Sequence, residues 1–415
     1  MKKNIFSMVN VNLRWFLLGM ILANIAGEML NSMLSLYLIK LGASVAQVGL
    51  VYTVASLVPI VLQIFGGWMS DTVGRLRAIA IGSVVTVFGY LIFFVSPSWQ
   101  WVMVGLCVEF VSSSFVVPSF NAYIAEQSEE EVRGRVFGVI QGIYMVVTVI
   151  GPILGGILAY RVSFKAMLVV AFIFFLLATL LRVYMALSER FKPERTPQKI
   201  SFKGLKTQLV SIFGLLFAGG ILTWIWVTDG LLDTSFNLTS QLFPIYLSDI
   251  GHLTVEQIGL FGSFFGGACI LGNFIGGWLT DKWSERTILT GGFAMLAASL
   301  VMMVTASSYF GFLLSRILMG LGDGVLSPAY SSLISRVVPE EKRGLAFGFF
   351  GTSLGVLSLP MPWIGGQLWE KFSPQTPFWI TAIACLIVVP VAWFKFRLPK
   401  TSSISVSAES NQVKD

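Results

Sequence analysis

The sequence predicts an all-α polytopic membrane protein, with twelve transmembrane helices arranged as two six-helix bundles that are parallel repeats of one another. Three observations predict this fold class. Of the 415 residues, 55% are hydrophobic and only 12% are charged, whereas a soluble domain carries about 25% charged residues. Apolar runs long enough to cross a bilayer recur along the chain. The two halves of the chain also match one another at a single constant offset.

The apolar runs are interpreted as helices, because a helix needs about 20 residues to cross the hydrocarbon core of a bilayer. Strands of a membrane barrel would instead show short segments of alternating polarity. The first run is longer than the core of a signal peptide, so it is expected to remain as the first span. The twelve spans are predicted at residues 13–39, 47–69, 78–96, 100–122, 136–159, 164–187, 212–247, 257–279, 287–306, 309–334, 345–367 and 377–397.

A polar stretch in the middle of the chain divides the spans into two groups of six. Residues 1–187 are expected to form the N-terminal bundle, and residues 212–397 the C-terminal bundle. Residues 188–211 begin with a basic stretch that carries two prolines, which is typical of a cytoplasmic linker. The Ser-rich residues 398–415 are expected to be a disordered cytoplasmic tail.

The distribution of Lys and Arg predicts the orientation, because positively charged loops stay in the cytoplasm. Only four of the 28 basic residues fall at the span ends opposite the two termini. Both termini are therefore expected to be cytoplasmic, in a multi-pass protein of the cell membrane. The short loops are typical of a prokaryotic inner membrane. The four exceptions are Lys40, Arg161, Lys165 and Lys371.

The composition also excludes several classes of function. The net charge is +7, but the basic residues lie in short loops between apolar runs, so no nucleic-acid partner is expected. The three cysteines lie singly in separate runs, and His252 stands alone in a loop. This spacing predicts no metal site. No phosphate loop or nucleophile constellation is present, so we expect neither a cofactor nor enzymatic activity.

The internal repeat relates the two halves by an offset of 210 residues. Six spans return the second half to the side on which the first began, so the repeats are parallel. Such repeats place a substrate path at their interface and can rock around it. The matched pairs include Gly49 with Gly259, Trp68 with Trp278, Asp71 with Asp281, Pro118 with Pro328, Arg133 with Arg343, and Pro152 with Pro362.

A glycine- and charge-rich loop follows the second span and recurs in the second half. Its first copy contains Gly67, Asp71, Gly74 and Arg75. This spacing resembles the loop motif of the Major Facilitator Superfamily, although Thr72 and Leu76 depart from it. The resemblance implies the superfamily fold and a conformational latch, in which charge pairs hold one conformation shut. The alternative is that these charges only orient the helices. The latch residues are expected to be Gly67, Asp71, Gly74, Arg75, Arg133, Asp281, Arg286 and Arg343.

A second motif lies in the fifth span, at Gly151, Pro152, Gly155 and Gly156. It resembles the antiporter motif of the same superfamily, with Val147 in place of the first glycine. Proline bends a helix, and glycines let helix backbones approach closely. The resemblance implies an antiporter, whereas a generic helix kink is the alternative reading.

Ionisable residues at membrane depth are functional candidates, because each costs about 2.5–3.5 kcal/mol on insertion scales. They fall in spans 1, 4, 7 and 10, and the resemblance implies that these helices line a central cavity. Asn24 and Asn31 share a helical face with the acid of span 1. Arg182 is placed near the cytoplasmic end of its span and is set aside. The candidates are Glu28, Glu109, Asp229, Asp233, Arg316, Asp323, Asn24 and Asn31.

These candidates are expected to bind substrate or to exchange protons, because carboxylates in a cavity of low dielectric resist ionisation. Arg316 is expected to pair with Asp323 or another acid. The alternative for any one of them is a structural salt bridge. Aromatic side chains near span 7 are either a binding wall or ordinary packing. They are Trp224, Trp226, Tyr330 and Phe120.

Together these observations predict a secondary active transporter that works by alternating access. Proton-coupled efflux of a small molecule is the leading hypothesis, with the protein acting as a monomer in the lipid bilayer. A proton symporter or facilitator that imports a sugar or organic acid is the first alternative. A non-transporting membrane sensor is the alternative from another class.

Overall fold

The helices of the first half occupy the predicted spans. The computed structural model describes residues 11–128, 132–188, 220–338 and 353–397, without the side chains of residues 63–68 and 71. Every predicted boundary in this half lies within four residues of the helix that the structure shows. The helices are α2 (Val11–Lys40), α3 (Val45–Val73), α4 (Arg75–Val95), α5 (Trp99–Glu126), α6 (Arg133–Arg161) and α7 (Phe164–Leu187).

The second half differs from its prediction at two spans. The predicted span 212–247 is two helices that are interrupted at residues 240–242, and its first residues lie outside the description. The predicted span 345–367 is described from residue 353 and is interrupted at residues 359–360. The helices are α9 (Ile221–Thr239), α10 (Phe243–Asp249), α11 (Val255–Lys282), α12 (Glu285–Thr305), α13 (Tyr309–Val337), α15 (Met361–Lys371) and α16 (Thr376–Lys395).

Prolines explain both interruptions. Pro244 lies in the first turn of α10, and Pro362 lies in the first turn of α15. A proline has no amide hydrogen and clashes with the preceding turn, so a helix often restarts at this residue. Apart from these breaks, ten of the described helices are long and apolar enough to cross a membrane. The predicted linker lies outside the described residues from residue 189 onward, and so does the predicted tail.

The repeat is visible in the way the helices begin. Ser44 caps α3 through a capping box with Gln47, and Thr254 caps α11 through the same arrangement with Gln257. Each cap satisfies two amide groups that have no partner within the helix. The two caps are 210 residues apart, as are the starts of α3 and α11. The parallel duplication thus extends to the first turn of corresponding helices.

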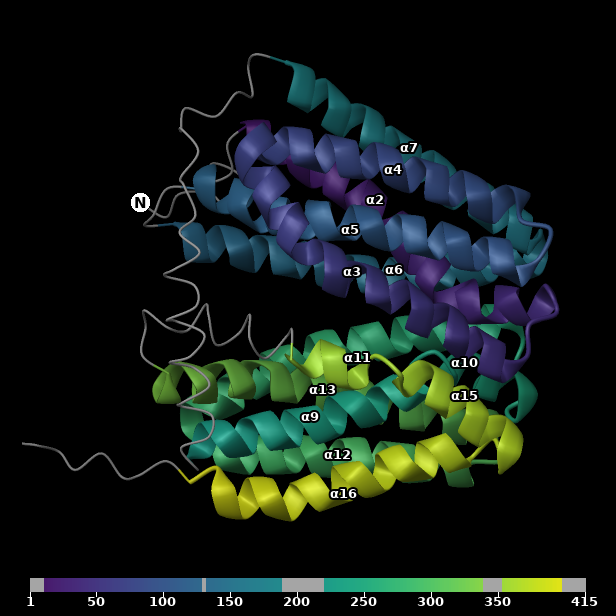
Figure 1. Ribbon diagram of the computed structural model, residues 1–415. Helices are drawn as coiled ribbons and strands as arrows, with labels where there is room; N and C mark the ends of the chain where they lie inside the picture. Colours follow the sequence, from purple (N-terminus) through teal and green to yellow (C-terminus); the bar gives the residue numbers. More distant parts are fainter. Residues whose placement is uncertain (1–10, 129–131, 189–219, 339–352, 398–415) are drawn as a thin grey trace, which may run out of the picture.

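The helices form two bundles that lie side by side (Figure 1). We call α2–α7 the N half and α9–α16 the C half. We call the end where α2 begins and α16 ends the terminal end, and the opposite end the distal end. Tyr90, Phe93, Phe293 and Phe378 are buried within the halves. Large apolar side chains such as Phe310, 77% exposed, face outward, as expected where lipid is the solvent.

The two halves contact one another toward the distal end and diverge toward the terminal end (Figure 1). An ion pair joins Arg161 of α6 to Glu256 of α11 at 2.8 Å. The Glu370 carboxylate accepts a hydrogen bond from the Ala46 amide at 2.8 Å. Each hydrogen bond or ion pair that joins described residues of the two halves lies in this distal part. We call the Arg161–Glu256 and Glu370–Ala46 contacts the distal clasps.

Candidate functional site

A cavity of about 920 Å³ lies between the two halves. Helices α2, α4, α5, α6 and α7 line it from the N half, and α10, α11 and α13 line it from the C half. It reaches Leu247 and Ile258 near the distal contacts, and Ile124 and Phe137 toward the terminal end. The contacts at the distal end therefore close one end of the space between the halves.

The cavity brings together six of the eight candidates from spans 1, 4, 7 and 10. Three come from α2, one from α5 and two from α13, so both halves contribute ionisable groups to one space. Asp229 and Asp233 of α9 are not among the lining residues. The six that line the cavity are Asn24, Glu28, Asn31, Glu109, Arg316 and Asp323.

Glu28 belongs to a polar cluster on the N-half wall. Tyr144 of α6 lies within electrostatic reach of Glu28, Asn24 and Arg182. Arg182 of α7 is buried and donates a hydrogen bond from Nη1 to Ser83 Oγ at 2.8 Å. Four helices thus place an acid, a phenol and a guanidinium beside one another at membrane depth. Such a cluster can hold a proton or a polar group of a substrate.

Glu109 occupies a more apolar part of the same wall. It lies near the phenol groups of Tyr52 and Tyr90. Its Oε2 atom is buried, and no hydrogen-bond partner for it occurs among the described residues. A charged carboxylate is costly to keep in such a place. Glu109 can therefore take up a proton without breaking an existing ion pair in the described structure.

Arg316 and Asp323 of α13 form the C-half wall, but they do not pair with one another. The Arg316 guanidinium lies between the rings of Phe243 and Phe265, at 4.8 and 4.6 Å from their centroids. Asp323 instead accepts a hydrogen bond from the Cys269 thiol at 3.4 Å. The predicted pairing of Arg316 with Asp323 is wrong because each side chain reaches a different neighbour.

Asp229 and Asp233 face other parts of the C half. The Asp229 carboxylate lies close to the Tyr330 phenol. Asp233 accepts a hydrogen bond from Ser358, in the helical turn that precedes α15. Spacing along α9 places the two acids on one face, and the structure covers that face with the neighbouring helices.

The predicted aromatic wall is dispersed in the structure. Phe120 lines the cavity, whereas Trp224, Trp226 and Tyr330 are not among its lining residues. Trp226 Nε1 donates a hydrogen bond to Ser353 Oγ at 3.0 Å, and Lys395 Nζ lies 4.6 Å from the centroid of the Trp224 ring. These tryptophans therefore serve contacts within the C half.

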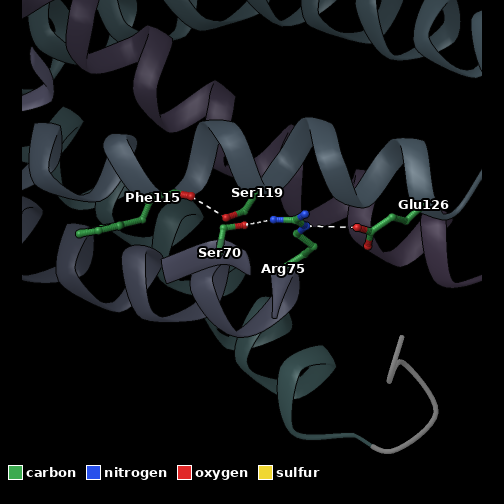
Figure 2. A network of polar contacts seen from close by, with 5 residues as sticks. All are labelled: Ser70, Arg75, Phe115, Ser119 and Glu126. Carbon is green, nitrogen blue, oxygen red and sulfur yellow. Dashed lines mark hydrogen bonds and ion pairs between the residues drawn. The ribbon is translucent and has the colours of Figure 1, made fainter. Parts of the chain in front are cut away.

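The latch motif of the N half contains a hydrogen-bonded arginine (Figure 2). Arg75 donates to Ser70 Oγ at 2.9 Å and to Glu126 Oε1 at 3.2 Å, so it links the end of α3 to the end of α5. Gly74 has φ of 94°, which allows the tight turn from α3 to α4. The surroundings of Gly67 and the side chain of Asp71 lie outside the description. Sequence reasoning missed Glu126.

The second half has the same contact with its charges exchanged. Glu285 and Arg336 form an ion pair at 2.9 Å, and each lies 210 residues after Arg75 and Glu126 respectively. Ser332 also donates to Glu285 at 2.9 Å. The repeat therefore conserves a pair of opposite charges between corresponding helices, but not which helix carries the acid.

The other predicted latch residues take part in neither the Arg75–Glu126 nor the Glu285–Arg336 ion pair. Asp281 is exposed at the end of α11. The Arg286 guanidinium lies 4.0 Å from the centroid of the Trp393 ring. The Arg133 Nε atom is buried and has no hydrogen-bond partner among the described residues. Arg343 lies outside the described residues.

The glycine and proline motif of α6 is a packing site for two other helices. α6 continues as one helix through Pro152. A Cβ atom at Gly151 would collide with the Glu28 side chain, and one at Gly155 would lie 2.8 Å from the Met29 carbonyl oxygen. On the adjoining face, a Cβ at Gly156 would lie 2.9 Å from the Cα of Gly259 in α11. The motif thus brings α6 close to the cavity acid of α2 and to the opposite half.

Several lining residues were missed by sequence reasoning. Arg182 was set aside because of its position near a span end, yet its long side chain reaches the cavity wall. Gln141 and Tyr144 share one face of α6, and this polar spacing was an available signal. Phe243 and Phe265 gave no signal, since isolated aromatic residues are common in membrane helices.

Comparison with known proteins agrees with this architecture. Two solved structures share the fold, each with a TM-score of 0.74. One is a POT family transporter in complex with 5-aminolevulinic acid, at 15% identity, covering 95% of this chain and 99% of that chain. The other is a bacterial homologue of the iron transporter ferroportin, at 16% identity, covering 93% of this chain and 98% of that chain.

Curated relatives cover most of the chain at low identity. Multidrug resistance protein 1 of Bacillus subtilis is 27% identical over 342 residues, which are 80% of this chain and 83% of that protein. Quinolone resistance protein NorA of Staphylococcus aureus is 23% identical over 346 residues, or 81% and 84% of the two chains. A Na(+), Li(+), K(+)/H(+) antiporter of Planococcus maritimus is 23% identical over 393 residues, or 86% and 91%.

The family comparison covers both halves. The model of the Major Facilitator Superfamily matches residues 16–251 and again residues 230–413. The two matches overlap at residues 230–251 and together cover nearly the whole chain. The chain belongs to the Major Facilitator Superfamily.

Proposed function

We propose that the chain is a secondary transporter that exports a small amphipathic molecule in exchange for protons by alternating access. It acts as a monomer in the cell membrane, with the terminal end and both termini on the cytoplasmic side. It performs no catalytic reaction. The proposal rests on one arrangement: acids from both halves line a single cavity, and the described polar contacts between the halves lie toward the distal end.

The acids of the cavity supply a reason for proton coupling. Glu28 and Glu109 come from the N half and Asp323 from the C half, and all three line one space. A carboxylate held at membrane depth gains by binding either a proton or a cationic group. Competition between the two at one site is sufficient to couple their movements in opposite directions.

The direction of transport is supported by the relatives. Two of them carry names that describe resistance to several drugs or to quinolones, and a third is named as a cation/proton antiporter. Resistance to a drug is consistent with its export, and the third name specifies exchange for protons, so together the names support export in exchange for protons. The positive charge at the terminal end supports the proposed orientation.

Reconstitution into liposomes with an imposed pH gradient tests this function. The vesicles contain a trapped pH indicator and an acidic interior, and a panel of amphipathic dyes is added outside. The panel holds cationic ethidium, neutral N-phenyl-1-naphthylamine and anionic 8-anilinonaphthalene-1-sulfonate. Exchange predicts that at least one dye enters while the interior becomes alkaline, and that an ionophore which collapses the gradient stops both changes.

The other outcomes contradict the proposal in distinct ways. Dye entry that requires an acidic exterior and acidifies the interior would identify a symporter. Dye movement that is independent of the gradient would identify a facilitator. No movement of any dye, beyond that in protein-free vesicles, would favour a membrane sensor. Vesicles without protein supply the background for each dye.

A further inference from the structure

Arg316 is held in the cavity wall by aromatic rings. Its guanidinium carbon lies 4.8 Å from the centroid of Phe243 in α10 and 4.6 Å from that of Phe265 in α11. All three residues line the cavity. Ring faces attract a cation without neutralising its charge. The two rings therefore fix the position of the guanidinium and leave its positive charge available.

The same guanidinium has no counter-ion in the described structure. Its Nη1 atom donates to the sulfur of Met319 at 3.4 Å, and a thioether is a weak acceptor. Its Nε atom is buried, and no described residue accepts a hydrogen bond from it. Among the described residues, no carboxylate lies within 4.0 Å of the Arg316 nitrogens. A guanidinium stays charged in proteins, so a buried one without a partner is an incomplete site.

The acids of the cavity are engaged elsewhere or belong to the opposite wall. Asp323 lies seven residues from Arg316 on α13 and accepts a hydrogen bond from the Cys269 thiol. Glu28 and Glu109 come from α2 and α5 of the N half. The part of the C-half wall around Arg316 is thus positive, while the N-half wall carries two acids together with Arg182, which donates a hydrogen bond to Ser83.

We propose that Arg316, Phe243 and Phe265 form the binding site for the anionic group of an amphipathic substrate. The planar guanidinium presents a fork of N–H donors that matches a carboxylate or sulfonate. The adjacent rings accept the flat apolar part of the same molecule. The acids of the N half then bind the proton or a cationic end of the substrate. This inference rests on the proposed transport function, because it defines what the cavity takes up.

A matched pair of fluorescent probes tests the anion site on the full-length chain. The anionic probe is 8-anilinonaphthalene-1-sulfonate, and the neutral probe is N-phenyl-1-naphthylamine, which has the same rings without the sulfonate. Each is titrated into vesicles of zwitterionic lipid that contain the purified protein, and the signal of protein-free vesicles is subtracted. The compared proteins are the unmodified chain, Arg316→Gln, Arg316→Lys and Lys40→Gln.

The control variant removes a cation that lies on a ring outside the cavity. Lys40 Nζ is 5.0 Å from the centroid of Phe164, at the distal end of α2, and neither residue lines the cavity. We expect Arg316→Gln to weaken binding of the sulfonate at least tenfold while the neutral probe changes less than twofold. We expect Arg316→Lys to lower the affinity ratio of the two probes at least threefold, because an ammonium keeps charge but loses the planar fork. Lys40→Gln should change neither probe.

Equal weakening of both probes by Arg316→Gln would overturn the inference, since it would indicate a structural role. Unchanged binding of both probes would also overturn it. If Arg316→Gln does not give a monodisperse protein, Arg316→Lys decides, and an unchanged affinity ratio in that variant rejects the site.

Failure of this inference is distinguishable from failure of the proposed function, because binding is measured without a pH gradient. If sulfonate binding depends on Arg316 but no dye moves in a proton-linked manner, the anion site is supported and the proposed proton exchange is rejected. If dye movement is proton-linked but the Arg316 variants leave the affinity ratio of the two probes unchanged, the proposed exchange is supported and the anion site is rejected.

Discussion

Glu109 and Glu285 are both acids inside helical bundles, but their surroundings differ. Glu285 is 3% exposed and has two partners, Arg336 and Ser332. The Oε2 atom of Glu109 has no described partner and its residue lines the cavity. An acid whose partners are satisfied stabilises the fold, whereas one without partners is free to bind and release a proton. The two residues should therefore respond differently to the same substitution.

Replacing Glu109 with Gln should abolish the coupling of dye movement to the pH gradient and leave stability nearly unchanged. The amide keeps the shape of the side chain but cannot exchange a proton. Glu285→Gln is the matched control, and it should lower the free energy of unfolding by about 1 kcal/mol. Dye exchange in liposomes and thermal unfolding of the purified proteins measure the two effects. Normal proton coupling in Glu109→Gln would remove this residue from the mechanism.

The exchanged charges of the repeat provide a second test at this scale. Arg75→Glu places two acids together and should reduce transport, because the link from α4 to α5 becomes repulsive. Arg75→Glu combined with Glu126→Arg reproduces the order of charges found at Glu285 and Arg336, so it should restore transport in part. Dye exchange by the single and double variants measures the recovery. A double variant no more active than the single one would show that Arg75 acts through other contacts.

Sequence reasoning identified the acids of the cavity but not their neighbours. A charge in an apolar run is conspicuous, so Glu28, Glu109 and Asp323 could be found without a structure. Helical spacing also placed Asp229 on one face with Asp233, yet spacing along one helix does not reveal which helix covers that face. Arg182 was missed because its position in the chain was considered without the reach of its side chain.

Among the elements, α6 connects the cavity to the contact between the halves. One face of its glycine motif packs on α2 beside Glu28, and the adjoining face packs on α11 of the C half. Both contacts bring backbone against backbone, so they leave no room for a side chain. The same segment of α6 thus packs against both the C half and the helix that carries an acid of the cavity.

Gly156→Val should prevent the distal contact from forming and reduce transport at least tenfold. The added side chain would meet the backbone of α11, which cannot yield as a flexible side chain does. Gly142→Val on the same helix is the control, since no atom lies within 4 Å of a Cβ built there. Dye exchange by the two variants at equal protein amounts measures the difference. Equal activity of both variants would mean that close approach of α6 and α11 is not required.

Hydropathy identified the elements well because lipid imposes a minimum length on each span. It failed at residues 240–242 and 359–360, where the helix is interrupted although the flanking residues are apolar enough to be taken as one span. Pro244 and Pro362, which lie in the first turns of the restarted helices, were visible in the sequence. Prolines also occur inside unbroken membrane helices, as Pro152 does in α6, so composition alone did not distinguish a break from a continuous helix.

For the whole molecule, the two distal clasps occupy related positions of the repeat. Glu256 at the start of α11 corresponds to Ala46 at the start of α3, and their partners lie at the ends of α6 and α15. The Pro152 and Pro362 carbonyl groups likewise approach Gly259 and Gly49, which are 210 residues apart. The contact between the halves therefore has approximate twofold symmetry, as a rocking motion about a central axis requires.

Arg161→Gln with Glu256→Gln should shift the population toward the state that is open at the distal end. The pair is partly exposed, so its loss is expected to change the population by up to about fivefold. Cys269 lines the cavity, and its labelling by an impermeant maleimide from the distal side reports opening in a Cys107→Ala, Cys385→Ala background. Lys371→Gln is the control at the same end. A labelling rate equal to that of the control would show that this clasp does not hold the closed state.

The symmetry of the distal contact bears on electrical leakage. Two backbone-to-backbone seals, α6 on α11 and α15 on α3, belong to the same pair of rigid halves. Rotation of one half against the other parts both seals together, so no intermediate with one seal open arises. The distal end therefore should have no half-open state that lets ions leak while the terminal end is still open, and a bilayer containing the protein should show no unitary conductance steps.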